Sequence, residues 1–276
     1  MFEMFNNALK DLSDALKKPK VRSIFVSFLF VGIFLFSYVI FASAHISTGL
    51  STLLANVTVA VSGIVYMKST NLVRYSMSPK AIGIGGYFGI FTLLAFIWLF
   101  SQITSYYLSV LFDPDVYKTY SNVAQENIII YFLLTVVFAP IGEEIMMRGV
   151  VFGVLQKAYP VYVAYIVSSI AFGVVHGTAA HIVVGSMCGL FFSFVYQYTG
   201  NIVASIFVHM VYNFACLTAT QLQIPTFFMQ PSVFIFFDIL IIVALIVWSV
   251  HVNRLQTKGP RYFNDKYVME YMRHAK

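Results

Sequence analysis

A small set of polar side chains interrupts long apolar stretches of this sequence, and these are the residues that could do chemistry. They fall in three separate stretches and comprise Glu143, Glu144, Arg148, His176, His209 and Asn213. A charged side chain costs about 2.5–3.5 kcal/mol at the centre of a membrane helix on insertion scales. Glutamate can take a proton from water, histidine can orient that water, and histidine with asparagine can donate to an oxyanion. Together they are the groups that a buried hydrolytic site needs.

The double glutamate is expected to divide into two roles. Glu144 precedes Arg148 by four residues, the favourable order for an ion pair within one helix. Glu143 is rotated about 100° from Glu144 around the helix and cannot share Arg148 equally. The alternative is a buried ion-pair network that only fixes helix packing. A second acid without a partner argues against it, because its burial adds a desolvation cost with no local compensation.

The histidine stretches also show helical spacing. His209 and Asn213 are four residues apart and point one way from their helix, and Phe172 lies one turn before His176. Each polar side chain could instead be a plain hydrogen-bonding group between helices. Their joint occurrence in three stretches favours one shared site. No HExxH sequence occurs, so the two-histidine zinc helix is absent.

Composition predicts the elements that must position these residues. The chain has 276 residues, of which 59% are hydrophobic and 10% charged, with a mean hydropathy of +0.82. Soluble domains carry about 25% charged residues, so soluble, fibrous and disordered classes are excluded. We predict an all-α, polytopic transmembrane helical bundle. The net charge of +6 comes from basic ends and one loop, a pattern typical of cytoplasmic segments rather than of nucleic-acid binding. Cys188 and Cys216 fall in apolar stretches and are expected to be free thiols.

About eight helices are predicted, and both basic termini are expected in the cytoplasm. The apolar segments run over 23–41, 49–67, 82–111, 128–156, 161–176, 181–199, 202–221 and 233–251. They form one transmembrane domain, 23–251, between a cytoplasmic amphipathic segment, 1–22, and a basic cytoplasmic tail, 252–276. The Gly83–Gly89 cluster predicts close helix packing. His176 falls near the outer end of its segment and His209 nearer the inner side, so a shared site needs tilted helices or a segment 161–176 that does not fully cross.

Three motifs carry a resemblance to a known family. Glu143-Glu144-x-x-x-Arg148, Phe172-x-x-x-His176 and His209-x-x-x-Asn213 occur in this order within 139–214. They resemble the motifs of the CPBP family, the CAAX-protease and bacteriocin-processing (Abi, Rce1-like) intramembrane endopeptidases. The expected eight-helix layout also resembles that family over most of the chain.

The resemblance implies a role for each motif residue. Glu143 and His176 would activate the attacking water, and His209 and Asn213 would stabilise the tetrahedral oxyanion. The supporting residues would be Glu144, Arg148 and Phe172. The family is usually labelled a metalloprotease family, which makes Glu143, His176 and His209 candidate zinc ligands. Because a ligating Glu143 could not also be a free general base, we expect hydrolysis without an obligatory metal, with zinc as the alternative.

The expected substrate is a membrane-embedded or membrane-adjacent peptide or protein, processed as in CAAX proteolysis, bacteriocin or signal-peptide maturation, or self-immunity. The other expected partner is the lipid bilayer of a bacterial plasma membrane, and no nucleic acid is expected. The alternative function is a non-catalytic immunity or scaffold protein that binds a peptide in the same cavity. A broken motif would mark it, and none is broken here. A transporter would show paired repeats, which are not seen. The cavity is expected to open to the cytoplasm or laterally between helices.

Overall fold

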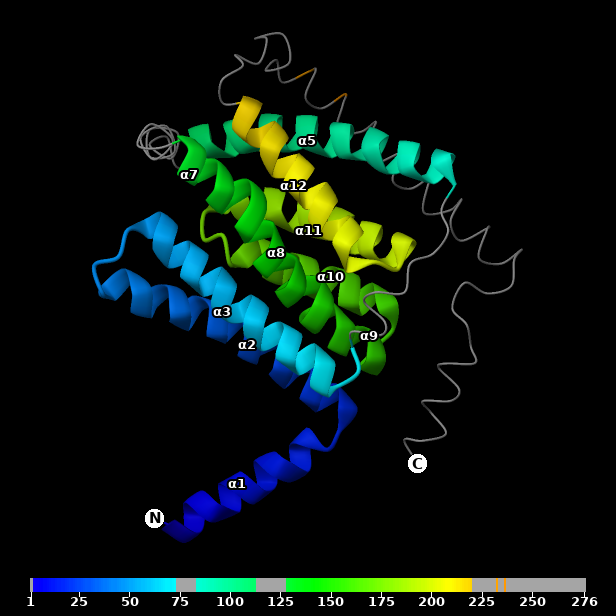
Figure 1. The fold of residues 1–276 in the computed structure, drawn as a ribbon. Coiled ribbons are helices and arrows are strands. Elements are labelled where there is room, and N and C mark those ends of the chain that lie inside the picture. The colour runs from blue at the N-terminus through cyan, green and yellow to red at the C-terminus, as the bar shows by residue number, and fades with distance from the viewer. Residues whose placement is uncertain (1, 73–82, 113–127, 220–231, 233–235, 237–276) are drawn as a thin grey trace. The chain divides into compact units, whose positions relative to one another are not determined.

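The computed structural model describes residues 2–72, 83–112, 128–219, 232 and 236, and its elements are helices (Figure 1). Counting the continuous stretch 128–158 as one, these ranges contain eight helices, in agreement with the predicted all-α class. They are α1 (Phe2–Leu16), α2 (Pro19–Ser43), α3 (Thr48–Ser69), α5 (Ile84–Phe112), the stretch 128–158, α10 (Val161–Val174), α11 (Ala179–Thr199) and α12 (Ile202–Ala219). The helices named here lie in one compact unit, Met1–Gln223.

Six of the described helices are long and apolar enough to cross a membrane. They cover Pro19–Ser43, Thr48–Ser69, Ile84–Leu108, Ile129–Ala158, Ala179–Thr199 and Ile202–Ala219, and they confirm six predicted segments. The predicted segment 161–176 forms a shorter helix, in agreement with the alternative that it does not fully cross. Helix α10 has 14 residues, about 21 Å at 1.5 Å per residue, against about 30 Å of membrane hydrocarbon. The predicted helix 233–251 and tail 252–276 lie almost entirely outside the described residues.

The stretch 128–158 changes its winding twice around the double glutamate. It consists of α7 (Ile128–Phe132), the π-helix η1 (Leu133–Phe138), α8 (Ala139–Glu144), the π-helix η2 (Ile145–Phe152) and α9 (Gly153–Ala158). Pro140 lies in the first turn of α8, where its ring would clash with the carbonyl of residue 136 in a regular α-helix. The wider π turn relieves such a clash, and single π turns are frequent at functional sites.

Small residues bring neighbouring helices close to the site. Gly173 of α10 packs on α11, since a Cβ there would lie 2.3 Å from the Ile182 carbonyl oxygen. Gly142 of α8 packs on α3, since a Cβ would lie 2.5 Å from Oδ1 of the buried Asn56. The predicted close packing at Gly83–Gly89 is not seen at three of the glycines in this range, Gly83, Gly85 and Gly89. A Cβ at Gly83, Gly85 or Gly89 would have no atom within 4 Å.

Candidate active site

The ion pair predicted between Glu144 and Arg148 forms the buried centre of the site. Arg148 Nη1 lies 2.9 Å from Glu144 Oε1, and both side chains are 0% exposed. The second guanidinium nitrogen, Nη2, donates to the Gly189 carbonyl of α11 at 2.8 Å. The guanidinium carbon lies 4.8 Å from the ring centre of Phe172 and 5.5 Å from that of Phe192. Aromatic faces attract the cation, so the charge is held on several sides in an otherwise apolar interior.

Glu144 holds two further groups, both from α12. Ser205 Oγ donates to its Oε2 at 2.6 Å, and His209 Nδ1 donates to its Oε1 at 2.9 Å. Because a carboxylate oxygen only accepts, Nδ1 must carry the proton. Glu144 therefore orients the His209 ring, in addition to the predicted pairing with Arg148. The sequence analysis missed Ser205. Its position four residues before His209, on the same helix face, was the available signal.

Glu143 points away from that ion pair, as predicted. Its side chain is 12% exposed, and its Oε2 lies 3.7 Å from His209 Nε2. His209 thus lies between the two glutamates, with one ring nitrogen toward each. The ring also stacks on Phe192, with centres 4.2 Å apart and planes 23° apart. The stacking and the Glu144 bond together fix the direction in which Nε2 points.

His176 lies beyond the end of α10, in the turn that leads to α11. Gly177 has a φ of 81°, a left-handed conformation that glycine adopts without strain. His176 Nδ1 lies 2.7 Å from the Phe172 carbonyl oxygen. A carbonyl only accepts, so Nδ1 donates and a neutral ring keeps its lone pair on Nε2. The Phe172 ring lies 4.9 Å from the His176 ring and 5.7 Å from that of His209, so Phe172 packs between the two histidines.

Asn213 is held by the irregular winding of the stretch 128–158. The Ala139 N–H donates to the Leu134 carbonyl, five residues back. In that register the Thr135 carbonyl would bond to the N–H of residue 140, which proline lacks. Asn213 Nδ2 fills the position, donating to the Thr135 oxygen at 2.8 Å. An amide nitrogen carries two hydrogens, so a second N–H remains for a ligand.

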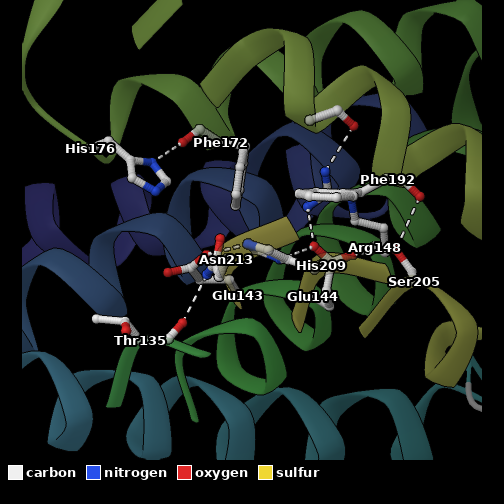
Figure 2. A network of polar contacts seen from close by, with 11 residues as sticks. Thr135, Glu143, Glu144, Arg148, Phe172, His176, Phe192, Ser205, His209 and Asn213 are labelled. Atoms are coloured by element: carbon white, nitrogen blue, oxygen red, sulfur yellow. Dashed lines mark hydrogen bonds and ion pairs between the residues drawn. The ribbon is translucent and has the colours of Figure 1, made fainter. Parts of the chain in front are cut away.

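The predicted residues come together in part through direct polar contacts and in part through their neighbours (Figure 2). Direct polar contacts join Glu143, His209, Glu144 and Arg148. His176 is joined to His209 by the Phe172 ring. Asn213 shares a helix face with His209. Sequence analysis missed Thr135, Gly189, Phe192 and Ser205, which come from three different elements.

The arrangement does not fit a three-ligand zinc site. The described part of the chain contains no group of three His, Cys, Asp or Glu side chains placed to hold a metal ion. A zinc site needs donor atoms at about 2.0–2.2 Å from one point. His209 and His176 each use Nδ1 for a protein acceptor, which leaves Nε2 of each ring available for a water molecule or another ligand.

Comparisons with known proteins concern the same region of the chain. Residues 125–215 match the family described as "Type II CAAX prenyl endopeptidase Rce1-like". A protein of Bacillus subtilis (strain 168) named "Putative membrane peptidase YdiL" is 33% identical over 81 residues, which is 29% of this chain and 33% of that protein. The chain thus spans about one third of that relative's length. No solved structure matches the chain.

Over these residues the chain is similar to the Rce1-like type II CAAX prenyl endopeptidase (CPBP) family, and this match confirms the resemblance carried by the three motifs. The matched residues contain all seven predicted site residues, together with Thr135, Gly189, Phe192 and Ser205.

Proposed function

We propose that this protein is an intramembrane endopeptidase that hydrolyses a peptide bond of a membrane-embedded or membrane-adjacent peptide. The observation that carries the proposal is the contrast within the double glutamate. Glu144 is fully occupied by Arg148, Ser205 and His209, whereas Glu143 is partly exposed beside His209. A carboxylate kept out of the ion pair with Arg148, next to an oriented histidine, is suited to take a proton from water.

The proposed reaction uses side chains in the positions described above. Glu143 takes a proton from a water molecule that His176 Nε2 orients. The water oxygen attacks the peptide carbonyl carbon, and the carbonyl oxygen becomes an oxyanion. Asn213 donates its second amide N–H to that oxygen. Glu143 then delivers its proton to the leaving amine nitrogen as the C–N bond breaks.

His209 can join in oxyanion stabilisation only in one protonation state. Its Nδ1 proton is committed to Glu144, so Nε2 can donate only when the ring is an imidazolium. Both glutamates face this ring. In the imidazolium state His209 would present positive charge where negative charge develops on the substrate.

We propose further that the reaction has no obligatory metal, because a Glu143 that ligated zinc could not also act as the free general base. Purified enzyme should then retain its activity after chelation and dialysis, and carry clearly substoichiometric zinc. Activity that vanishes with the chelator and returns with added zinc would contradict this proposal.

The proposed setting is a bacterial plasma membrane with both termini in the cytoplasm. The segment 1–22 would lie at the cytoplasmic surface, 23–251 would form the transmembrane domain, and 252–276 the cytoplasmic tail. Substrates would come from bacteriocin, signal-peptide or CAAX-like processing or from self-immunity. The six candidate spans and the named peptidase relative support a membrane location.

The test is peptide release from candidate membrane substrates by the wild type and by E143Q. The amide keeps the volume of Glu143 but cannot take the proton, so release should fall by about 10²–10⁴-fold. Asp14→Asn is a matched control, because it removes an exposed carboxylate of α1 that pairs with Lys17. Equal release by wild type and E143Q would contradict the general-base role. Peptide binding without any release would favour the non-catalytic immunity or scaffold function.

A further inference from the structure

The exposed fraction of the side chains in the polar network increases along one direction. On α12, Ser205 is 0% exposed, His209 is 3% exposed, and Asn213 is half-buried. The stretch 128–158 runs the opposite way beside it, since Glu144 bonds Ser205 and Thr135 bonds Asn213. Exposure also increases along this stretch, toward the same end of the site.

Along that second helix, Arg148 and Glu144 are 0% exposed, Glu143 is 12% exposed at its side chain, and Thr135 is half-buried. His176 is exposed. Two antiparallel helices therefore agree on the direction in which the site is open.

Cations gather at the opposite end of the helices. They lie before and in the first turn of α2, in the last turn of α3 and in the last turn of α9, and comprise Lys17, Lys18, Lys20, Arg22, Lys68 and Lys157. Lys20 Nζ lies 5.6 Å from the ring centre of Tyr159, which brings the start of α2 to the end of α9. Helices α2 and α3 pack together and are joined by residues 44–47. The end of α3 therefore lies on the same side as the start of α2 and the end of α9.

The two ends of these helices also differ in their content of basic residues. The connections 44–47 and 175–178, at the other end of these helices, contain no Lys or Arg. Clusters of Lys and Arg next to membrane helices mark the cytoplasmic side.

Helix length places the site far from the basic end. Lys157 follows Glu143 by 14 residues, about 21 Å along a helix at 1.5 Å per residue. Helix α10 starts next to the end of α9 and also runs 14 residues before His176 is reached. The hydrocarbon layer is about 30 Å thick, so both residues lie beyond its midplane when measured from the basic end.

We infer that the site opens to the extracytoplasmic half of the membrane and takes an apolar peptide segment from the outer leaflet. The inference rests on the proposed function. The Glu144–Arg148–Ser205 network closes the site toward the cytoplasm. Exposed apolar side chains flank the open side, among them Leu133, Val174 and Phe214. Of the two openings expected from the sequence, to the cytoplasm or laterally between helices, the inferred opening departs from the first and agrees with the second.

The first experiment tests sidedness without requiring activity. Ala179→Cys places a thiol at the exposed start of α11, three residues after His176, and Ser69→Cys places one at the exposed, basic end of α3. Intact cells and permeabilised cells are treated with a membrane-impermeant maleimide. Wild type supplies the background from Cys188 and Cys216, which lie in α11 and α12.

Ala179→Cys should react fully in intact cells, whereas Ser69→Cys should react only after permeabilisation. A failure of Ala179→Cys to react in intact cells, or labelling of both variants from the same side, overturns the inference.

The second experiment maps the bonds cut in peptides whose release depends on Glu143. These bonds should lie in the extracytoplasmic half of the substrate's membrane segment. Glu143-dependent cuts that face the cytoplasm, such as removal of residues from a lipidated cytoplasmic C-terminus, overturn the inference but leave the endopeptidase function standing. If no release depends on Glu143, the proposed function fails, while maleimide labelling still decides which side the site faces.

Discussion

The two halves of the polar network contain similar side chains in very different surroundings. Glu144, Arg148 and Ser205 are 0% exposed and bonded to one another. Glu143 and Asn213 lie beside them but retain partial exposure. A buried charge without partners is strongly unfavourable, so the closed half must keep its bonds to remain folded. The open half, Glu143 and Asn213, is partly exposed, so its polar groups can contact a reacting molecule. The two adjacent glutamates are chemically alike and differ in burial and in their partners, which is the basis of the two roles proposed for them.

The substitution E144Q is the most direct test of the difference between the two glutamates. Arg148 would keep its charge but lose its carboxylate partner, and removal of one member of a buried ion pair costs about 3–5 kcal/mol. The free energy of unfolding, measured by denaturation in detergent micelles, should fall by that amount. E143Q is the matched control and should leave it nearly unchanged. Equal destabilisation by E144Q and E143Q would contradict the claim that only Glu144 stabilises the fold.

The open half is tested by N213A in the peptide-release assay. Loss of one oxyanion donor lowers kcat by about 10²–10³-fold, and KM should change little because the interaction forms mainly in the transition state. The N213D variant keeps the shape of the side chain but places a carboxylate acceptor there, so it should be equally impaired. A loss confined to KM would assign Asn213 to substrate binding instead.

The smallest expected effect comes from S205A. The hydroxyl of Ser205 donates to Glu144, and an unsatisfied buried acceptor costs about 1–3 kcal/mol. Ser27→Ala is the matched control, because Ser27 is also buried but donates to the Ser23 carbonyl within its own helix. The unfolding free energy should fall more for S205A than for Ser27→Ala. The reverse order would mean that Ser205 contributes little to holding Glu144.

Features that depend only on position along one helix could be predicted from the sequence. It predicted the Glu144–Arg148 pair, the separation of Glu143 from it, and the common face of His209 and Asn213. Each follows from about 3.6 residues per turn, which fixes the angle between nearby side chains. Long apolar runs likewise predicted the membrane segments, because a helix must be about 20 residues long to cross the hydrocarbon.

The contacts between helices could not be predicted in this way. The bond from His209 to Glu144 joins residues 65 positions apart, and the stacking of Phe192 on His209 depends on the rotation of α11 against α12. The bond from Asn213 to Thr135 depends on a π turn before Pro140. Periodicity fixes neither the depth nor the rotation of one helix relative to another, since both are set by packing at small residues such as Gly173 and Gly142.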